Sequence, residues 1–319
     1  MIVITGAAGS IGSVFLGLLN EQQLRDAVLI DDFAQPTQYN NLAWKHYSEI
    51  VSTDEMEVYL SANKGQIDAI VHLGNREDLA IDDRVERIQE EREMHQYLWF
   101  FCSQNEIPFI YSSTAEVYKN STIGNKDDAE TSFKLEPNHL YVKAKLALDN
   151  WSLRQESQPP FWASLRITNV YGPNEYHKNE QASIVLKAYN EILANQFMVL
   201  HDTRENQSTS LLKDYIYIMD VAKIIWFLID QQPNSGIYNI GSATNIKAEE
   251  VCDIIFDALG IEKKYQYHPF EKEGRQEVSQ SDSINISKLR EAGYTQKMTS
   301  IEDGVKQYVN RFLKRGEFY

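Results

Sequence analysis

The sequence predicts an α/β protein with a doubly wound parallel sheet and a second, smaller α/β part. Two observations predict this class. Short apolar runs alternate with longer amphipathic runs through the first half of the chain, as they do where helices cover both faces of a parallel sheet. A glycine-rich turn also follows the first apolar run directly, where such a sheet passes from a strand into a helix.

The strands of the first half are expected from apolar runs of buried-strand length, and the helices from apolar residues spaced three and four apart. The predicted strands are 2–5, 27–31, 68–74, 108–114 and 161–172. The predicted helices are 10–22, 85–105 and 141–155.

The pattern changes after the Tyr-Gly-Pro turn that begins at residue 171. The elements predicted there are a helix at 182–195, an extended run at 197–202, a polar loop at 204–213, a strand continuing into a helix at 214–231, a strand at 236–242, a helix at 245–260 that ends at Gly260, and a helix at 299–316. Such a change of order indicates a second structural unit.

Composition excludes several classes of protein. The 319 residues carry a formal charge of −15, which argues against a surface for nucleic acid or anionic membranes. The two cysteines, Cys102 and Cys252, lie in apolar helical contexts and are expected to be buried core thiols, with no disulfide and no metal site. The first residues show no signal peptide and no run has the length of a membrane span, so a reducing cytoplasm is expected.

The turn TGAAGSIG (5–12) spaces Gly6, Gly9 and Gly12 three residues apart between a strand and a helix. The first glycine permits a tight turn, the second lets backbone N–H groups approach a pyrophosphate, and the third allows close packing of helix on strand. The helix N-terminus then faces the negative charge. A glycine-rich turn without a ligand is the alternative, but its place at the start of a βαβ series favours a dinucleotide.

The second strand ends at Asp31-Asp32, about 20 residues further on. A carboxylate there can accept hydrogen bonds from an adenosine ribose and would repel a 2′-phosphate. No lysine or arginine follows until Lys45, so NAD is favoured over NADP. Asp31 is the preferred ribose ligand, because Asp32 can equally begin a turn.

HLYVKAK (139–145) places Tyr141 and Lys145 four residues apart, on one face of a helix. An ammonium beside a phenol favours the phenolate. Such a tyrosine can take a proton from a sugar hydroxyl while a hydride leaves the same carbon. Upstream, YSSTAEVY (111–118) puts three hydroxyls at a strand end, those of Ser112, Ser113 and Thr114, one of which could hydrogen-bond the reacting oxygen. An ordinary strand-end cap is the alternative.

These three elements, in this order and spacing, resemble the extended short-chain dehydrogenase/reductase superfamily over essentially the whole chain. The resemblance implies a Rossmann fold, a nicotinamide dinucleotide, a nucleotide-sugar substrate and a homo-oligomer. It implies a catalytic set of Tyr141, Lys145 and either Thr114 or Ser113. Further cofactor contacts are expected from Ser10, Ile11 and Leu73. The dinucleotide-binding domain is then 1–170, with returning segments near 214–243, and 171–319 is mainly substrate-binding.

Within that superfamily the chain is most similar to the ADP-glyceromanno-heptose 6-epimerase family. The similarity rests on LRITNVYGPNEYHKNEQAS (165–183), KDYIYIMDVAKIIWFL (213–228), GIYNIGSATNIKAEEV (236–251), GRQEVSQSD (274–282) and LREAGY (289–294). In that family the lysine after the Tyr-Gly-Pro turn is a second acid/base, a role that maps onto Lys178. A solvated lysine or a phosphate contact is the alternative for Lys178, and His177 is expected to be structural.

Four polar side chains are candidates for a diphosphate. Asn169 can donate to it, and Lys213 stands where the family carries arginine. Arg275 is the strongest candidate, because its guanidinium matches phosphate oxygens. Arg166 lies inside an apolar strand and is equally well explained as a structural ion-pair partner.

Several positions depart from the family pattern. Glu and Arg replace expected asparagines within 75–97, Asn179 replaces a glycine and Gln181 a methionine, and the basic residues that accompany NADP are missing. A 4-epimerase that uses Tyr141 alone therefore stays open, as does a dehydratase or decarboxylase with Thr114-Ala115-Glu116 after the strand. A catalytically silent NAD-binding protein is the alternative from another class.

Overall fold

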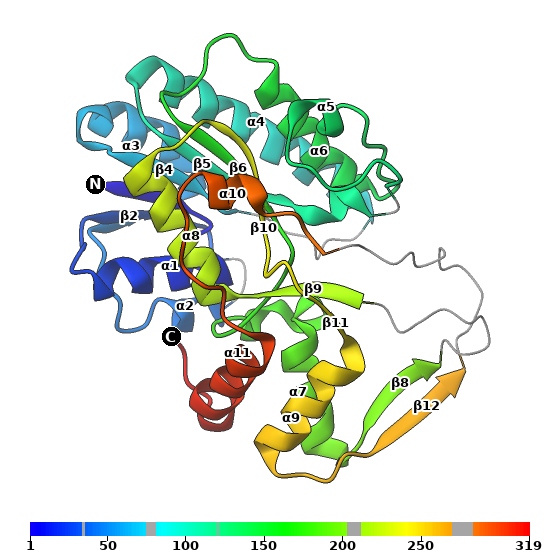
Figure 1. Cartoon of the computed structure of the whole chain (residues 1–319). Helices are drawn as coiled ribbons and strands as arrows, with labels where there is room; N and C mark the ends of the chain where they lie inside the picture. Colours follow the sequence, from blue (N-terminus) through cyan, green and yellow to red (C-terminus); the bar gives the residue numbers. More distant parts are fainter. Residues whose placement is uncertain (34–35, 75–80, 120, 203–211, 270–282) are drawn as a thin grey trace.

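A computed structural model describes residues 1–33, 36–74, 81–119, 121–202, 212–269 and 283–319. Its centre is a seven-stranded parallel sheet in the order β10-β6-β5-β4-β1-β2-β3 (Figure 1). The strands are β1 (Ile2–Thr5), β2 (Ala27–Ile30), β3 (Glu49–Val51), β4 (Ala69–His72), β5 (Phe109–Thr114), β6 (Trp162–Ile167) and β10 (Gly236–Ile240). The predicted doubly wound sheet is confirmed.

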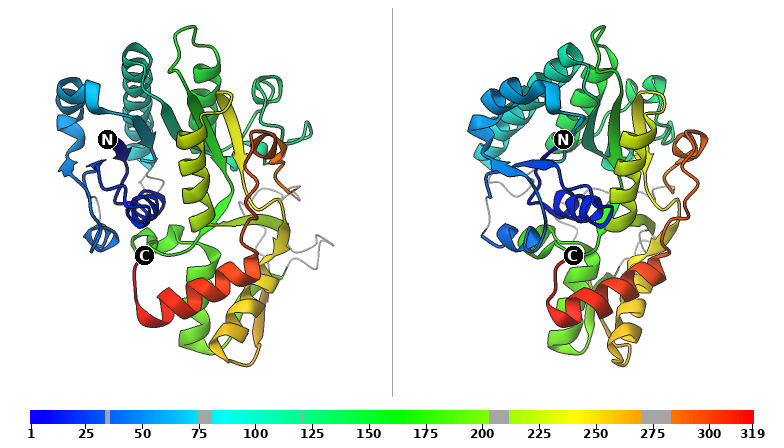
Figure 2. Two further views of the ribbon diagram at one scale, coloured as in Figure 1. Left: turned by 60° about the vertical axis from the view of Figure 1, so that its left-hand side comes forward. Right: turned by 90° about the vertical axis from the view of Figure 1, so that its left-hand side faces the viewer.

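Helices cover both faces of this sheet because its strands are apolar on both sides. In β1, Ile2 and Ile4 enter one core cluster while Val3 enters the other, as the two-residue period of a strand requires. One face carries α1 (Ser10–Glu21) and α8 (Ile218–Gln231), which pack on each other and lie side by side in both views of Figure 2. The other carries α3 (Met56–Asn63), α4 (Ile81–Asn105) and α6 (Leu140–Leu153).

A smaller α/β part lies beyond the carboxyl ends of the strands (Figure 2). It holds a three-stranded sheet, β11-β9-β7, and a parallel pair, β12-β8. Its strands and helices are β7 (Asn169–Tyr171), α7 (Ile184–Asn195), β8 (Met198–Asp202), β9 (Leu212–Tyr217), β11 (Asn245–Lys247), α9 (Ala248–Leu259), β12 (Tyr265–Pro269) and α11 (Ile301–Gln307). The predicted fold class, a parallel sheet with a smaller α/β part, is therefore confirmed.

Four predicted elements differ from the structure. In the predicted helix 245–260, the first three residues form the strand β11 (Asn245–Lys247). The run 161–172 forms two strands, β6 and β7, because the chain leaves the large sheet at Thr168, whose N–H donates to Ile240 O. Leu212 and Lys213 belong to β9 and not to a loop, while 203–211 lie outside the described residues. The last helix changes to π geometry at Tyr308–Phe312 and to 3₁₀ geometry at Leu313–Arg315.

The remaining elements were not predicted because they are short or bury few residues. In α3, for example, only Met56 and Leu60 are buried. The others are the strands β3 and β12, the helices α2 (Gln38–Asn41), α5 (Ala129–Ser132) and α10 (Ser287–Glu291), and the 3₁₀ turns η1 (Thr53–Glu55), η2 (Lys64–Gln66), η3 (Ala115–Tyr118) and η4 (Tyr176–Gln181).

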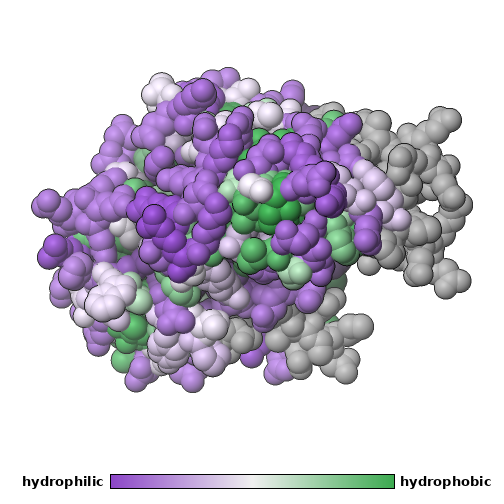
Figure 3. Space-filling view, turned by 90° about the horizontal axis from the view of Figure 1, so that it is seen from below, coloured by the Kyte–Doolittle hydropathy of each residue, from purple (hydrophilic) through white to green (hydrophobic). Residues whose placement is uncertain are grey.

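Cys102 and Cys252 are free and buried, as predicted. Among the described residues, no helix has the length and apolarity needed to cross a bilayer. The face that includes the smaller part is mostly hydrophilic, with hydrophobic residues confined to small patches (Figure 3).

Candidate active site

The glycine turn forms a cradle that side chains would fill. Gly6 has φ +64°, and a Cβ there would lie 2.5 Å from the N atom of Gly74. A Cβ on Gly12 would lie 2.4 Å from Gly6 O, so helix α1 can approach the strand only with glycine at this position. Gly9 caps α1, whose first turn contains no acidic residue to compete for its exposed N–H groups. The cradle therefore fits a pyrophosphate.

A cleft of about 790 Å³ opens over this cradle, at the carboxyl ends of the strands. Ligands bind at this edge in open α/β sheets. Of the residues predicted from sequence, those lining it are Gly6, Gly9, Ser10, Ile11, Gly12, Asp31, Asp32, Leu73, Ser112, Ser113, Thr114, Tyr141, His177 and Lys178. The structure thus gathers most of the predicted cofactor and catalytic residues in one cavity.

The two aspartates at the end of β2 make different contacts. Asp31 accepts from the N–H of Ala8 at 2.9 Å and from that of Phe33 at 3.0 Å, so it braces the glycine turn. Each of its oxygens keeps a lone pair for a ribose hydroxyl. Asp32 accepts from the N–H of Thr53 at 2.8 Å and from its hydroxyl, which ties the end of β2 to η1. These contacts with Thr53 fit the alternative interpretation of Asp32, in which its carboxylate begins a turn and does not bind a ribose.

Tyr141 and Lys145 lie on the same face of α6, as their spacing predicts. The Nζ atom of Lys145 is 5.8 Å from the centroid of the Tyr141 ring. Lys145 is 3% exposed, forms an ion pair with Glu91 of α4 and donates to Ser112 O at 3.3 Å. The phenol lines the cleft while the ammonium is held behind it, which is the arrangement that favours a phenolate.

The three hydroxyls at the end of β5 have different surroundings. Ser113 donates to Asp149 Oδ2 at 3.0 Å, below the cleft. The Ser112 hydroxyl is buried and has no hydrogen-bond partner among the described residues. Thr114 accepts from the N–H of Glu116 at 3.2 Å as the cap of η3. Because a hydroxyl that accepts can still donate, Thr114 remains able to hold a reacting oxygen.

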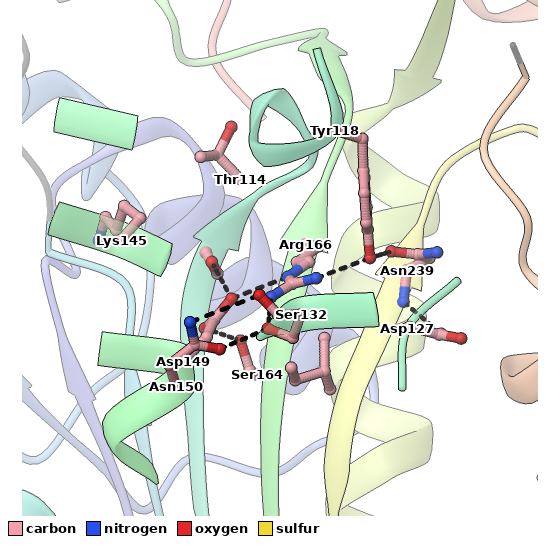
Figure 4. A network of polar contacts seen from close by, with 12 residues as sticks. Thr114, Tyr118, Asp127, Ser132, Lys145, Asp149, Asn150, Ser164, Arg166 and Asn239 are labelled. Carbon is pink, nitrogen blue, oxygen red and sulfur yellow. Dashed lines mark hydrogen bonds and ion pairs between the residues drawn. The ribbon is translucent and has the colours of Figure 1, made fainter. Parts of the chain in front are cut away.

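Ser113 belongs to a buried polar network that joins α6 to the sheet (Figure 4). Asp149 lies one turn after Lys145 and accepts from Ser164 at 2.6 Å and from Arg166 Nε at 2.8 Å. Arg166 also donates to Tyr118 at 2.8 Å, and both charged side chains are fully buried. The alternative of a structural ion pair for Arg166 is therefore confirmed.

Lys178 lines the same cleft and belongs to a different element, η4. Its side chain is half-buried and has no hydrogen-bond or ion-pair partner among the residues that the structure describes. His177 lies next to it, with Nδ1 3.3 Å from Asn41 Nδ2, so it has a structural contact. Tyr141 and Lys178 are brought from separate elements to one cavity, as a two-base site requires.

The diphosphate candidates lie on the smaller sheet. Asn169 donates to the main-chain O of Asp214 at 2.8 Å, and Lys213 is nearby on β9. Although the Lys213 side chain reaches solvent, partial desolvation and then the charge of Lys119 lower its pKa, and Lys187 acts in the same direction. Neither Asn169 nor Lys213 lines the cleft as defined above, and Arg275 lies outside the described residues.

Two histidines are buried next to Lys145. Thr5 Oγ1 and His72 Nδ1 are 2.6 Å apart, and Ser152 Oγ and His95 Nε2 are 3.1 Å apart. Burial, and then the charge of Lys145, lower the pKa of His72 to about 3. Burial and then His72 lower the pKa of His95 well below its usual value. Both rings are therefore neutral and add no charge beside the lysine.

Sequence reasoning did not identify Glu91, Asn41, Lys119 or Lys187 as members of the site. Glu91 precedes His95 by one helical turn, so a search for polar residues on the buried face of α4 could have found it. Asn41 is 1% exposed and donates to Ala8 O at 2.8 Å and to Asn174 O at 3.1 Å, contacts that no local pattern indicates.

The sequence profile of the NAD dependent epimerase/dehydratase family matches residues 2–241. A protein of Fusobacterium nucleatum subsp. nucleatum named ADP-L-glycero-D-manno-heptose-6-epimerase is 32% identical over 100% of both chains. A protein of Nitratidesulfovibrio vulgaris strain Hildenborough with the same name is 30% identical over 98% of both chains.

Solved structures share the fold. The Helicobacter pylori ADP-L-glycero-D-manno-heptose-6-epimerase has a TM-score of 0.78 at 23% identity, covering 97% of this chain and 95% of that one. The UDP-N-acetylglucosamine 4-epimerase of Methanobrevibacter ruminantium M1 has a TM-score of 0.80 at 20% identity, covering 98% of both.

Proposed function

Because this chain belongs to the NAD dependent epimerase/dehydratase family, we propose that it inverts C6 of ADP-D-glycero-D-manno-heptose to give the L-glycero epimer. The chain is an NAD-dependent enzyme of that family. The observation that supports the specific proposal is the pair of candidate bases, Tyr141 on α6 and Lys178 on η4, which line one cleft. Full-length relatives named for this activity support it.

The residues of the glycine turn would hold the pyrophosphate of NAD, Asp31 the adenosine ribose, and Lys145 the nicotinamide ribose. NAD, when bound, accepts a hydride from the sugar carbon and returns it. Asp31 and the turn are already joined through Ala8, so the part that would bind adenosine is braced before any ligand enters.

Tyr141 would take the proton of the C6 hydroxyl as the carbon loses its hydride, which leaves a 6-keto sugar. Thr114 would donate to the developing oxyanion. Hydride returns to the opposite face of that carbon, so the proton that restores the hydroxyl must come from a different direction. Lys178 would deliver it, and the two residues would exchange roles in the reverse reaction.

The phosphate end of the substrate would meet local positive charge in a chain whose formal charge is −15. Lys213 lies close enough to Lys119 and Lys187 for their charges to lower its pKa. Anions pair with such clusters through charge-assisted hydrogen bonds. Asn169, on the strand β7 that pairs with β9, would add a donor.

The experiment is to incubate the protein and NAD with the ADP-heptose, deuterated at C6, in ordinary water and to follow the products by NMR. Deuterium retained at C6 in both epimers supports internal return of the hydride. Loss of label from C6, or release of water or CO2, contradicts the proposal and favours a dehydratase or decarboxylase.

UDP-, GDP- and dTDP-hexoses form the parallel arms of the experiment. Interconversion at C4 of one of these, with the heptose left unchanged, would assign a 4-epimerase instead.

We also infer a reducing cytoplasm, which the two free buried thiols support, and a homo-oligomer, which sedimentation would measure.

A further inference from the structure

We propose that Glu91 is a positioning residue for the reaction: its carboxylate holds the ammonium of Lys145 behind Tyr141 and sets the pH at which Tyr141 works as a base. The inference rests on the proposed role of Tyr141. Its starting point is the ion pair between Glu91 and Lys145, whose side chains are 16% and 3% exposed.

The geometry gives Glu91 a specific task. A lysine ammonium has three N–H donors. Lys145 uses one on Glu91 and one on Ser112 O, two residues that line the cleft, and this leaves one donor for a ligand or for the tyrosine oxygen. The two fixed contacts come from α4 and β5, so they anchor Nζ from two directions while the 14-residue helix α6 carries it.

The other charged and titratable groups around this pair do not replace Glu91. They are Arg87, Glu90 and His95 on α4, His72 on β4, Tyr111 on β5, and Tyr141 and Asp149 on α6.

Arg87 and Glu90 pair with each other at 2.7 Å, and Asp149 pairs with Arg166 at 2.8 Å. The two histidines and Tyr111 are neutral because burial shifts their pKa values away from the charged forms. Within the described residues, Glu91 is thus the carboxylate that Lys145 contacts.

An ammonium that is paired with a carboxylate stabilises a phenolate less than an unpaired one does. Glu91 therefore fixes the position of Lys145 and, at the same time, reduces the stabilisation that Lys145 gives to the Tyr141 phenolate. Replacing its charge should make the phenolate easier to form, because the charge of Lys145, 5.8 Å from the Tyr141 ring centroid, then acts on Tyr141 without an opposing carboxylate.

The test compares Glu91→Gln with the wild type. Glutamine keeps the size and an acceptor oxygen but removes the charge. The tyrosines are labelled with ¹³C at Cζ, the Tyr141 signal is assigned by its absence in Tyr141→Phe, and its titration is followed by NMR in the NAD complex. This readout needs no sugar substrate, so it stands even if no sugar nucleotide is turned over.

We expect the Tyr141 titration in Glu91→Gln to move to lower pH by about one unit, which is about a tenfold rise in the phenolate to phenol ratio at fixed pH. The rising limb of kcat should move by the same amount on any substrate that is turned over. Glu93→Gln is the matched control, since Glu93 is exposed on the same helix and bonds Gln89.

Glu91→Asp is the second variant, because it keeps the charge but withdraws it by one carbon. Its titration should lie between those of the wild type and Glu91→Gln. Circular dichroism shows which of the two variants folds, and a single folded variant is enough to test the proposal. A Tyr141 titration that coincides with the wild type in a folded Glu91 variant would overturn the proposal.

Discussion

The side-chain amide of Asn41 donates a hydrogen bond of 2.8 Å to the main-chain oxygen of Ala8. The same nitrogen donates to Asn174 O at 3.1 Å. One buried side chain therefore connects the glycine turn to the loop that leads to Lys178. The nucleotide cradle and the second candidate base are held in register by this contact.

Removing that amide should destabilise the protein. Asn41→Ala leaves two buried carbonyl oxygens without their donor, and we expect the free energy of unfolding to fall by about 1–3 kcal/mol. Urea denaturation measures the change. Asn40→Ala is the control, because Asn40 is exposed on the same short helix. Equal losses in the two variants would show that the connection contributes nothing.

Lys178→Ala should slow interconversion of the epimers by about 10²-fold or more, because a positioned acid or base contributes at least that much. The Kd for NAD should not change. Lys143→Ala removes a lysine that is exposed on α6 and should leave the rate intact. An undiminished rate in Lys178→Ala would assign that side chain to solvent.

Asn179 occupies a backbone conformation that suits glycine, with φ 47° and ψ −119°. A side chain in such a region costs about 1–3 kcal/mol. Asn179→Gly should therefore raise the free energy of unfolding, while Asn179→Ala should lower it. Glu180→Gly, at an exposed neighbour without positive φ, should destabilise. If Asn179→Gly and Asn179→Ala have the same free energy of unfolding, the backbone at position 179 is not strained.

Acid should destabilise the fold through His72. The pKa of this buried ring is about 3 in the folded chain, against 6.5 for an exposed histidine, so the unfolded state binds the extra proton and stability falls as pH drops through that window. His72→Gln should abolish about 2 kcal/mol of the loss that the wild type shows between about pH 7 and pH 5.

The control for this experiment is His46→Gln, which replaces an exposed histidine. It should leave the pH dependence of the unfolding free energy unchanged. A wild-type slope that persists in His72→Gln would mean that other groups take up the protons.

Preference for NAD should depend on the surroundings of Asp32 and Gln38, which line the adenosine end of the cleft. Asp32→Ser with Gln38→Arg removes a repelling carboxylate and adds a guanidinium for the 2′-phosphate of NADP. We expect NADP to bind about 10- to 100-fold more tightly, as one or two charge-assisted bonds allow. Gln66→Arg adds the same charge on an exposed turn remote from the cleft and should not alter either Kd.

Every strand of the large sheet except β3 could be predicted from the sequence, because each of the others is a local apolar run. Strands β3 and β11 could not, since three residues make too short a pattern and depend on the partner strand for their hydrogen bonds. The split of 161–172 into β6 and β7 was missed for a related reason. Which sheet a residue joins depends on its neighbour across the ladder, which the local sequence does not contain.

The candidate site divides in the same way. The glycine turn and the Tyr141–Lys145 pair are short motifs whose geometry follows from one turn or one helix. The direction of Ser113 is not local: its hydroxyl faces Asp149, which lies 36 residues away. Glu91 meets Lys145 across 54 residues, a contact that exists only because α4 and α6 pack on the same face of the sheet.

The sequence by itself determined the fold class, and it predicted where a nucleotide would bind and that Tyr141 and Lys145 share one helix face, because backbone periodicity and glycine geometry act over a few residues. Only the tertiary structure decided which carboxylate faces Lys145, which hydroxyl at the end of β5 bonds Asp149 and how Asn41 links the two loops. These depend on side chains brought together from distant segments, where packing and burial select one partner among many of the same chemical type.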